Sequence, residues 1–188
     1  APIVAVNGPV TRLAVEGDVR GSIAAQNGGF NVIDIGGSLG STNASTSVYA
    51  WSGQVYYAIA SLNVGGDIGT PERHVEISTG GPVRFIEADA IHADINTMLD
   101  PSDLGFFGGM TTRNGNFAGS LYARTLTSFG YDSGATCALQ INGDLDAFIF
   151  FENGTRNERR NGPEIDIAGS IRPTALLSVA TMITSDPS

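Results

Sequence analysis

In the stretch LNVGGDIGT, residues 62–70, apolar residues alternate with polar or small ones before two glycines and an acid follow. Leu62 and Val64 are two positions apart, which is the side-chain period of a β-strand. The glycine pair and Asp67 then precede a further apolar residue, Ile68. A hairpin turn would by itself explain the two glycines. The same pattern recurs along the chain, however, so we interpret it as one unit of a repeat.

Seven copies of this pattern occur, with alternating apolar residues, a glycine and then Asp or Ser, and one of them has Ala93 in place of the glycine. The closest copies are LAVEGDV at 13–19, IDIGGSL at 33–39, LNVGGDI at 62–68, LQINGDL at 139–145 and IDIAGSI at 165–171. Looser copies are DAIHADI at 89–95 and NGNFAGSL at 114–121. The reference positions are Gly17, Gly37, Gly66, Ala93, Gly119, Gly143 and Gly169. Their nearly even spacing is typical of a repeat protein.

The repeat predicts an all-β fold, a single-domain parallel β-solenoid of about seven coils. We expect the domain to cover residues 1–188, with repeat coils from about residue 13 to residue 183. Further strands are expected at 55–59, 74–78, 120–126 and 147–151, and no helical pattern separates them as a βαβ fold would require. The alternative is an antiparallel β-sandwich in which the repeat marks alternate strands.

In the solenoid, the apolar residues and the glycines of each copy are expected to point inward and to stack into ladders. The residue after the glycine would then point outward. The outward set is Asp18, Ser38, Asp67, Asp94, Ser120, Asp144 and Ser170. Because Asp and Ser alternate freely there, we favour a structural role in which small polar side chains bond to the backbone.

Asp67 and Asp94 raise two other interpretations, since the repeat places them on adjacent turns. Paired carboxylates can bind Ca²⁺ together with carbonyl oxygens, so this pair is a weak cation candidate. Such a pair can also serve a glycoside hydrolase or a polysaccharide lyase. His74 and His92 are both expected to face solvent, without a second ligand at zinc spacing. We predict no catalytic residue and no cofactor, with Ca²⁺ as the weak alternative.

Composition excludes several function classes. The 188 residues carry a net charge of −9 with only ten Lys and Arg, so nucleic-acid binding is not expected. No run approaches the roughly 20 apolar residues of a membrane span. A single cysteine rules out an internal disulfide.

Two segments are candidates for contact with a partner. The polar loop at 151–164 holds Arg156, Arg159 and Arg160, which could contact an acidic partner. The aromatic segment VYAWSGQVYY at 48–57 places Tyr49 and Trp51 on one face of a strand, where they could stack on sugars or contact another subunit.

The pattern resembles that of secreted right-handed parallel β-helix proteins, the β-solenoid stalks of bacterial surface proteins and adhesins. The resemblance spans Leu13 to about Ile183, and its motif is set by coil geometry. It implies a structural or adhesive scaffold that is extracellular or at the cell surface. A carbohydrate-active enzyme and a glycan-binding module on a β-helix are the alternatives.

Both ends of the chain are apolar, with APIVAVNGPV at the start and ALLSVATMI near the end. A solenoid exposes unpaired backbone groups at its first and last turns, and arrays need polar caps there. We therefore expect the ends to contact further protein: other copies of the chain, as in a filament, or the rest of a longer surface protein.

Overall fold

The computed structural model describes residues 2–5, 8–51, 57–100, 105–127, 137–153, 155–156 and 164–179. These residues form strands, turns and loops, and no helix occurs among them. The strands fall into three sheets, and every pairing between named strands is parallel. This confirms the predicted parallel β-solenoid and excludes the antiparallel sandwich.

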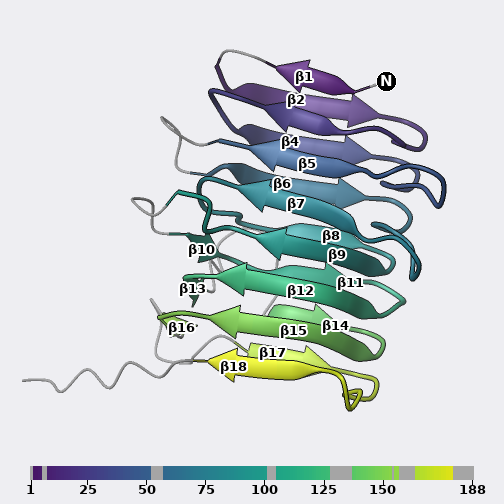
Figure 1. Cartoon of the computed structure of the whole chain (residues 1–188), viewed down its shortest axis with the longest axis vertical. Coiled ribbons are helices and arrows are strands. Elements are labelled where there is room, and N and C mark those ends of the chain that lie inside the picture. Colours follow the sequence, from purple (N-terminus) through teal and green to yellow (C-terminus); the bar gives the residue numbers. More distant parts are fainter. Residues whose placement is uncertain are drawn as a thin grey trace, which may run out of the picture.

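The largest sheet has eight strands stacked in chain order (Figure 1). They are β1 (Ile3–Ala5), β3 (Ile23–Ala25), β5 (Ser47–Ala50), β7 (Val75–Thr79), β9 (Ile91–Asn96), β12 (Phe117–Ala123), β15 (Leu145–Phe151) and β18 (Leu176–Val179).

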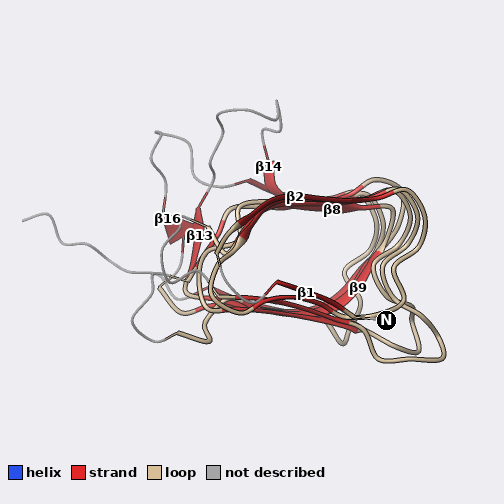
Figure 2. Ribbon diagram, turned by 90° about the horizontal axis from the view of Figure 1, so that it is seen from above, coloured by secondary structure: helices blue, strands red, loops and turns tan. Residues whose placement is uncertain are grey.

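A seven-stranded sheet lies opposite the first. It contains β2 (Val10–Val15), β4 (Phe30–Ile35), β6 (Ile59–Val64), β8 (Ile86–Ala88), β11 (Met110–Thr112), β14 (Cys137–Ile141) and β17 (Glu164–Ile167). A small third sheet of β10 (Phe106–Phe107), β13 (Thr125–Thr127) and β16 (Thr155–Arg156) lies at one side of the coils (Figure 2). Two of the seven strands are edges, so about five turns are enclosed between neighbours, slightly fewer than the seven coils predicted.

The core lies between the two large sheets and consists of stacked aliphatic side chains. One column runs through the whole seven-stranded sheet: Leu13, Ile33, Leu62, Ile86, Met110, Leu139 and Ile165 are successive register partners. Its members from Ile33 to Leu139 are fully buried. The predicted inward stacking of the apolar residues that begin the five closest copies, Leu13, Ile33, Leu62, Leu139 and Ile165, is therefore confirmed. Stacking of this kind removes apolar surface from water at every turn, which stabilises the fold.

The register of the two looser copies was predicted wrongly. Ile91 pairs with Ile68 on one side and with Phe117 on the other, so these three residues are equivalent. The predicted reference positions Ala93 and Gly119 instead lie inside β9 and β12, where they pair with each other. The true equivalents of Asp67 are Ala90 and Asn116, which lack the Gly-Asp or Gly-Ser signature and were missed for that reason.

The repeat glycines also do not form an inward ladder. Apart from Gly119, they lie in the corner turns that connect the seven-stranded sheet to the eight-stranded sheet, and Gly66 is only half-buried. Glycine is needed there because successive backbones approach closely. A Cβ on Gly65, for example, would lie 2.2 Å from the carbonyl oxygen of Gly36 on the preceding coil. The physical reason for glycine is thus close stacking of turns, and a narrow core plays no part.

Candidate functional site

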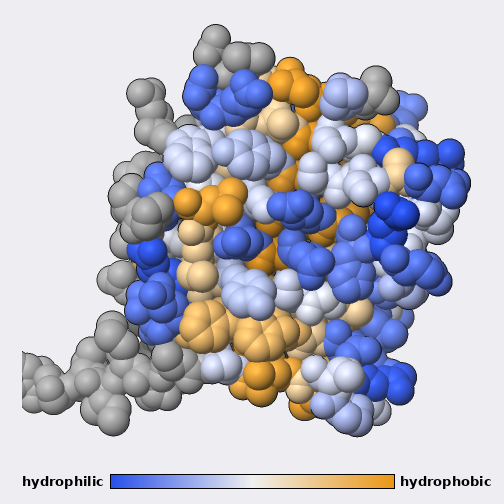
Figure 3. Space-filling model, viewed as in Figure 1, coloured by the Kyte–Doolittle hydropathy of each residue, from blue (hydrophilic) through white to orange (hydrophobic). Residues whose placement is uncertain are grey.

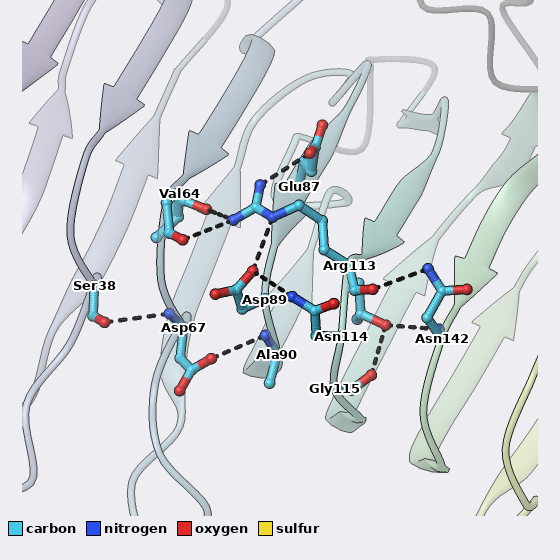
Figure 4. Close-up of polar contacts among 12 residues, drawn as sticks. Ser38, Val64, Asp67, Glu87, Asp89, Ala90, Arg113, Asn114, Gly115 and Asn142 are labelled. Atoms are coloured by element: carbon cyan, nitrogen blue, oxygen red, sulfur yellow. Dashed lines mark hydrogen bonds and ion pairs between the residues drawn. The ribbon is translucent and has the colours of Figure 1, made fainter.

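The corner turns carry a column of small residues, all polar except Ala90, which we call the corner ladder. It consists of Asp18, Ser38, Asp67, Ala90, Asn116, Asp144 and Ser170, one from each coil. The backbone N–H of Ser38 donates to Asp18 Oδ1 at 3.0 Å, and that of Asp67 to Ser38 Oγ at 3.2 Å. The N–H of Ala90 donates to Asp67 Oδ1 at 3.0 Å (Figure 4). Each side chain thus satisfies a backbone donor of the next coil.

The ladder resumes after Ala90, which has no side-chain acceptor. The N–H of Asp144 donates to Asn116 Oδ1 at 2.8 Å, and the N–H of Ser170 donates to Asp144 Oδ1 at 2.9 Å. This bond from Ser170, with the nearby Arg172 guanidinium, lowers the pKa of Asp144. The N–H of Ser38 and the Arg20 guanidinium lower the pKa of Asp18 in the same way. Hydrogen bonds to the charged form favour that form in both cases.

Arg113 lies beside the break in the ladder and links three coils. Its guanidinium contacts Glu87 Oε1 and Asp89 Oδ1, both at 2.9 Å, on the preceding coil. It also donates to the carbonyl oxygens of Val64 and Gly65, one coil further back (Figure 4). The planar group with five donors suits this arrangement, which a lysine could not reproduce. Arg113 is therefore a structural clip for the corner that lacks a ladder bond.

Asp67 and Asp94 do not form the pair that the repeat predicted. The residue next to Asp67 on the following coil is Ala90, whereas Asp94 lies within β9 on the outer face of the eight-stranded sheet. The prediction failed because it depended on the misplaced register of the fourth copy. Among the described residues, no group of three or more His, Cys, Asp or Glu is arranged to hold a metal ion. Calcium binding at either residue stays an untested prediction.

Asp94 instead belongs to a groove of about 550 Å³ on the outer face of the eight-stranded sheet. We call it the axial groove because its floor crosses successive strands along the solenoid axis. One column of its floor is Ser47, Glu76, Asp94 and Ser120, which are register partners on β5, β7, β9 and β12. The next outward column is Tyr49, Ser78, Asn96 and Tyr122 on the same strands.

Hydroxyl groups bond to the two carboxylates of the groove. Ser78 Oγ donates to Glu76 Oε1 at 2.9 Å, and Ser120 Oγ donates to Asp94 Oδ1 at 2.8 Å. His74 Nδ1 lies 3.4 Å from Asp94 Oδ2. Glycine at 119 lets β12 approach β9 here, since its φ is +121° and a Cβ would lie 2.1 Å from the Ala93 carbonyl oxygen. Among the described residues, the groove lining includes no Lys or Arg, and the Arg73 guanidinium donates to Ser45 Oγ at its edge at 3.3 Å.

The hydropathy of the outer face of the eight-stranded sheet changes along the solenoid axis (Figure 3). Hydrophilic residues cover its middle coils, and apolar residues gather over β15 and β18. Tyr122 packs against Phe148, with ring centroids 5.2 Å apart, and against Phe150 at 6.4 Å. The polar groove therefore ends at a group of aromatic rings.

The histidines differ from each other. His74 lines the groove, whereas His92 is partly covered, and its buried Nδ1 atom has no hydrogen-bond partner among the described residues. Burial lowers the pKa of His92, and the neighbouring His74, with ring centroids 6.4 Å away, lowers it further. His92 lies between the buried Ile91 and Ala93 and so points outward as expected, although it is only partly exposed.

The other candidate residues lie apart from the groove floor or outside the described side chains. Trp51 packs over Gly80, where a Cβ would lie 2.6 Å from the indole ring, and Tyr49 is half-buried beside Ser78. Arg156 contributes its backbone to β16, and its side chain lies outside the described part of the chain, as do Arg159 and Arg160. Contact roles for these residues stay predictions.

Sequence reasoning missed the axial groove because its residues come from different coils and share no motif. The signal appears only when the correct register is known, since Glu76, Asp94 and Ser120 then align in one outward column.

Comparison with protein-family models, with curated proteins and with solved structures finds no match. Within the described residues, no helix has the length and apolar character needed to cross a membrane.

Proposed function

We propose that this chain is a structural scaffold whose coils continue end to end into a second copy of the same chain. The observation that carries the proposal is the exposure of one core column at its two ends. This column consists of Ile3, Ile23, Val48, Ile77, Ile95, Leu121, Ile149 and Leu177, which are successive register partners.

The six inner members of this column are at most 1% exposed, whereas Ile3 is 36% exposed and Leu177 is 45% exposed. Both end residues belong to the inward-facing set, so another coil placed on either end would cover them. Leu13 and Ile165 behave similarly at the ends of the other sheet, where they are only partly buried. Covering these side chains would contribute the hydrophobic free energy that inner coils already gain.

Backbone groups at the ends support the same contact. The strands β1 and β18 are the edges of the eight-stranded sheet, and β2 and β17 are the edges of the seven-stranded sheet. Unpaired edges accept further strands. Because all strands are parallel, the last coil of one copy can pair with the first coil of the next in the register used throughout the molecule. Such a head-to-tail contact is heterologous and gives an open filament unless it closes into a ring.

The corner ladder would continue across the same junction. Ser170 is its last member and Asp18 its first, so stacking would bring the Ser170 hydroxyl beside the Asp18 N–H. That is the arrangement between Ser38 and Asp67 inside the molecule. Location at the cell surface or outside the cell is part of the proposal, and it rests on the resemblance to β-solenoid stalks.

We propose no catalytic role for the chain. Glu76 and Asp94 are neighbours on adjacent strands, as the close carboxylates of a retaining glycosidase are. An acid catalyst, however, needs a dry environment that keeps its proton, and the Asp94 side chain is 54% exposed. Exposure of this kind favours a binding or structural role over catalysis.

Sedimentation velocity and electron microscopy of the 188-residue chain test the scaffold proposal. We expect rods whose length grows with protein concentration. Leu177→Asp should shift the population to monomers, because the charge would be buried at the junction. Leu176→Asp is the matched control, since Leu176 is 52% exposed, close to the 45% of Leu177, but belongs to the outward set with Phe148. A monodisperse wild-type monomer at high concentration, or equal effects of the two substitutions, would contradict the proposal.

A further inference from the structure

We infer that the axial groove binds a neutral polysaccharide, with the sugar chain lying along the solenoid axis across β5, β7, β9 and β12. This inference is independent of end-to-end assembly, because the groove lies on the side of the coils. Its volume of about 550 Å³ is within the usual range for ligand sites. Its floor is ordered and polar, and it is built from regular strands, which hold side chains more precisely than loops do.

The hydrogen-bonding groups of the groove suit hydroxyl ligands. Glu76 and Asp94 each accept a hydrogen bond from a serine hydroxyl, so the groove already presents carboxylates in contact with alcohol groups. Asn96 adds an amide, which is both donor and acceptor. A pyranose carries neighbouring hydroxyls that can bond to such a set in the same way. These residues repeat along the axis at the strand spacing of about 4.8 Å, which is close to the length of one pyranose unit.

An aromatic ring lies at one end of this polar floor. Tyr122 lines the groove and is the last member of the column Tyr49, Ser78, Asn96, Tyr122. Tyr122 is 38% exposed and continues into Phe148 and Phe150. A ring that presents an apolar face beside polar groups matches a sugar, whose C–H face is apolar and whose rim carries hydroxyls.

The charge of the groove selects among polysaccharides. Among the described residues, its lining holds two carboxylates, Glu76 and Asp94, and the Arg73 guanidinium donates to Ser45 Oγ at its edge. An acidic chain would be repelled by the two carboxylates. A cationic chain would meet the Arg73 guanidinium at the same edge. The Tyr122 ring, the serine hydroxyls and the Asn96 amide can contact a neutral chain without either repulsion, so a neutral chain is favoured.

Isothermal titration of the full chain with hexasaccharides tests the inference. The neutral arms are β-linked hexamers of glucose and of mannose, the acidic arm is oligogalacturonate, and the cationic arm is deacetylated chitosan. We expect at least one neutral hexamer to bind more tightly than the acidic and cationic ones. Tyr122→Ala should weaken this binding by about tenfold, as expected for the loss of one aromatic contact.

Two further variants make the test decisive. Asp94→Asn keeps the shape of the side chain and should also weaken binding, while circular dichroism shows that the fold is retained. Thr111→Ala is the control, since Thr111 lies on the outer face of the seven-stranded sheet in β11, and its affinity should equal that of the wild type. Tighter binding of the acidic or cationic hexamer, no binding of either neutral hexamer, or unchanged affinity in Tyr122→Ala and Asp94→Asn would overturn the inference.

Discussion

The corner ladder and the axial groove both present polar side chains outward, but these side chains bond to different partners. In the ladder, the oxygen of Asp67 accepts the backbone N–H of Ala90. In the groove, the oxygen of Asp94 accepts the hydroxyl of Ser120. Polar side chains that accept a backbone N–H of the next coil thus stabilise the stack of coils. The carboxylates of the groove bond to serine hydroxyls, and the hydroxyls of a ligand could take the place of these.

Among substitutions that test this comparison, we expect the largest loss of stability at Arg113, which links the coils where the corner ladder is interrupted. Arg113→Ala removes contacts to Glu87, Asp89 and two carbonyl oxygens. We expect the free energy of unfolding to fall by about 2–3 kcal/mol, as for other hydrogen bonds to charged groups. Denaturant unfolding measures this value.

Arg12→Ala is the matched control for Arg113. Arg12 forms a single ion pair with Asp34 at 2.8 Å, and its side chain is 66% exposed. Such a surface pair contributes about 0–1 kcal/mol. If the two substitutions cost the same, Arg113 is an ordinary surface residue and the clip assignment is wrong.

A pair of substitutions, one in the corner ladder and one in the axial groove, tests the difference between them directly, with a smaller expected change in stability. Asp67→Ala leaves the N–H of Ala90 without its acceptor and should cost about 1 kcal/mol of stability, as loss of a helix N-cap does. Asp94→Ala should cost less than about 0.5 kcal/mol, since no backbone donor depends on it among the described contacts. In hexasaccharide titrations the order should reverse, with Asp94→Ala weakening affinity and Asp67→Ala leaving it unchanged. Equal behaviour of the two variants in both assays would abolish the distinction.

The smallest expected effect is the pH dependence of the ladder. The pKa values of Asp18 and Asp144 are lowered by backbone N–H groups and nearby arginines. A carboxyl whose folded pKa lies below its unfolded value stabilises the fold above the unfolded pKa, near pH 4, and this contribution is lost as the pH falls through the folded pKa. The stability difference between wild type and the Asp18→Asn, Asp144→Asn double variant should therefore shrink below about pH 4. A difference that stays constant down to pH 2 would show that these bonds do not depend on charge.

The sequence predicted the fold correctly because coil geometry imposes the same constraint on every turn. Leu62 must stack on Ile33 and on Ile86, and that requirement appears as a repeated apolar position. Two corners escaped notice because Ala90 and Asn116 replace the usual acid or serine. The groove could not be predicted, since Glu76 and Asp94 become neighbours only through a register that their local sequences do not reveal. Repeated sequence patterns predict the contacts that recur on every coil. Contacts that occur only once between coils, such as that of Glu76 with Asp94, can be identified only in the structure.

The break in the corner ladder at Ala90 also has a mechanical consequence. In a solenoid each coil contacts only its neighbours, so unwinding under tension proceeds one coil at a time from an end. Arg113 departs from this rule, because it joins its own coil to the carbonyl oxygens of Val64 and Gly65 two coils earlier. A pulling force that separates coils from the C-terminal end therefore meets additional resistance at the structural clip formed by Arg113. Separating the coil of Arg113 requires breaking its contacts with the two preceding coils. We therefore expect unwinding to pause at the middle of the molecule.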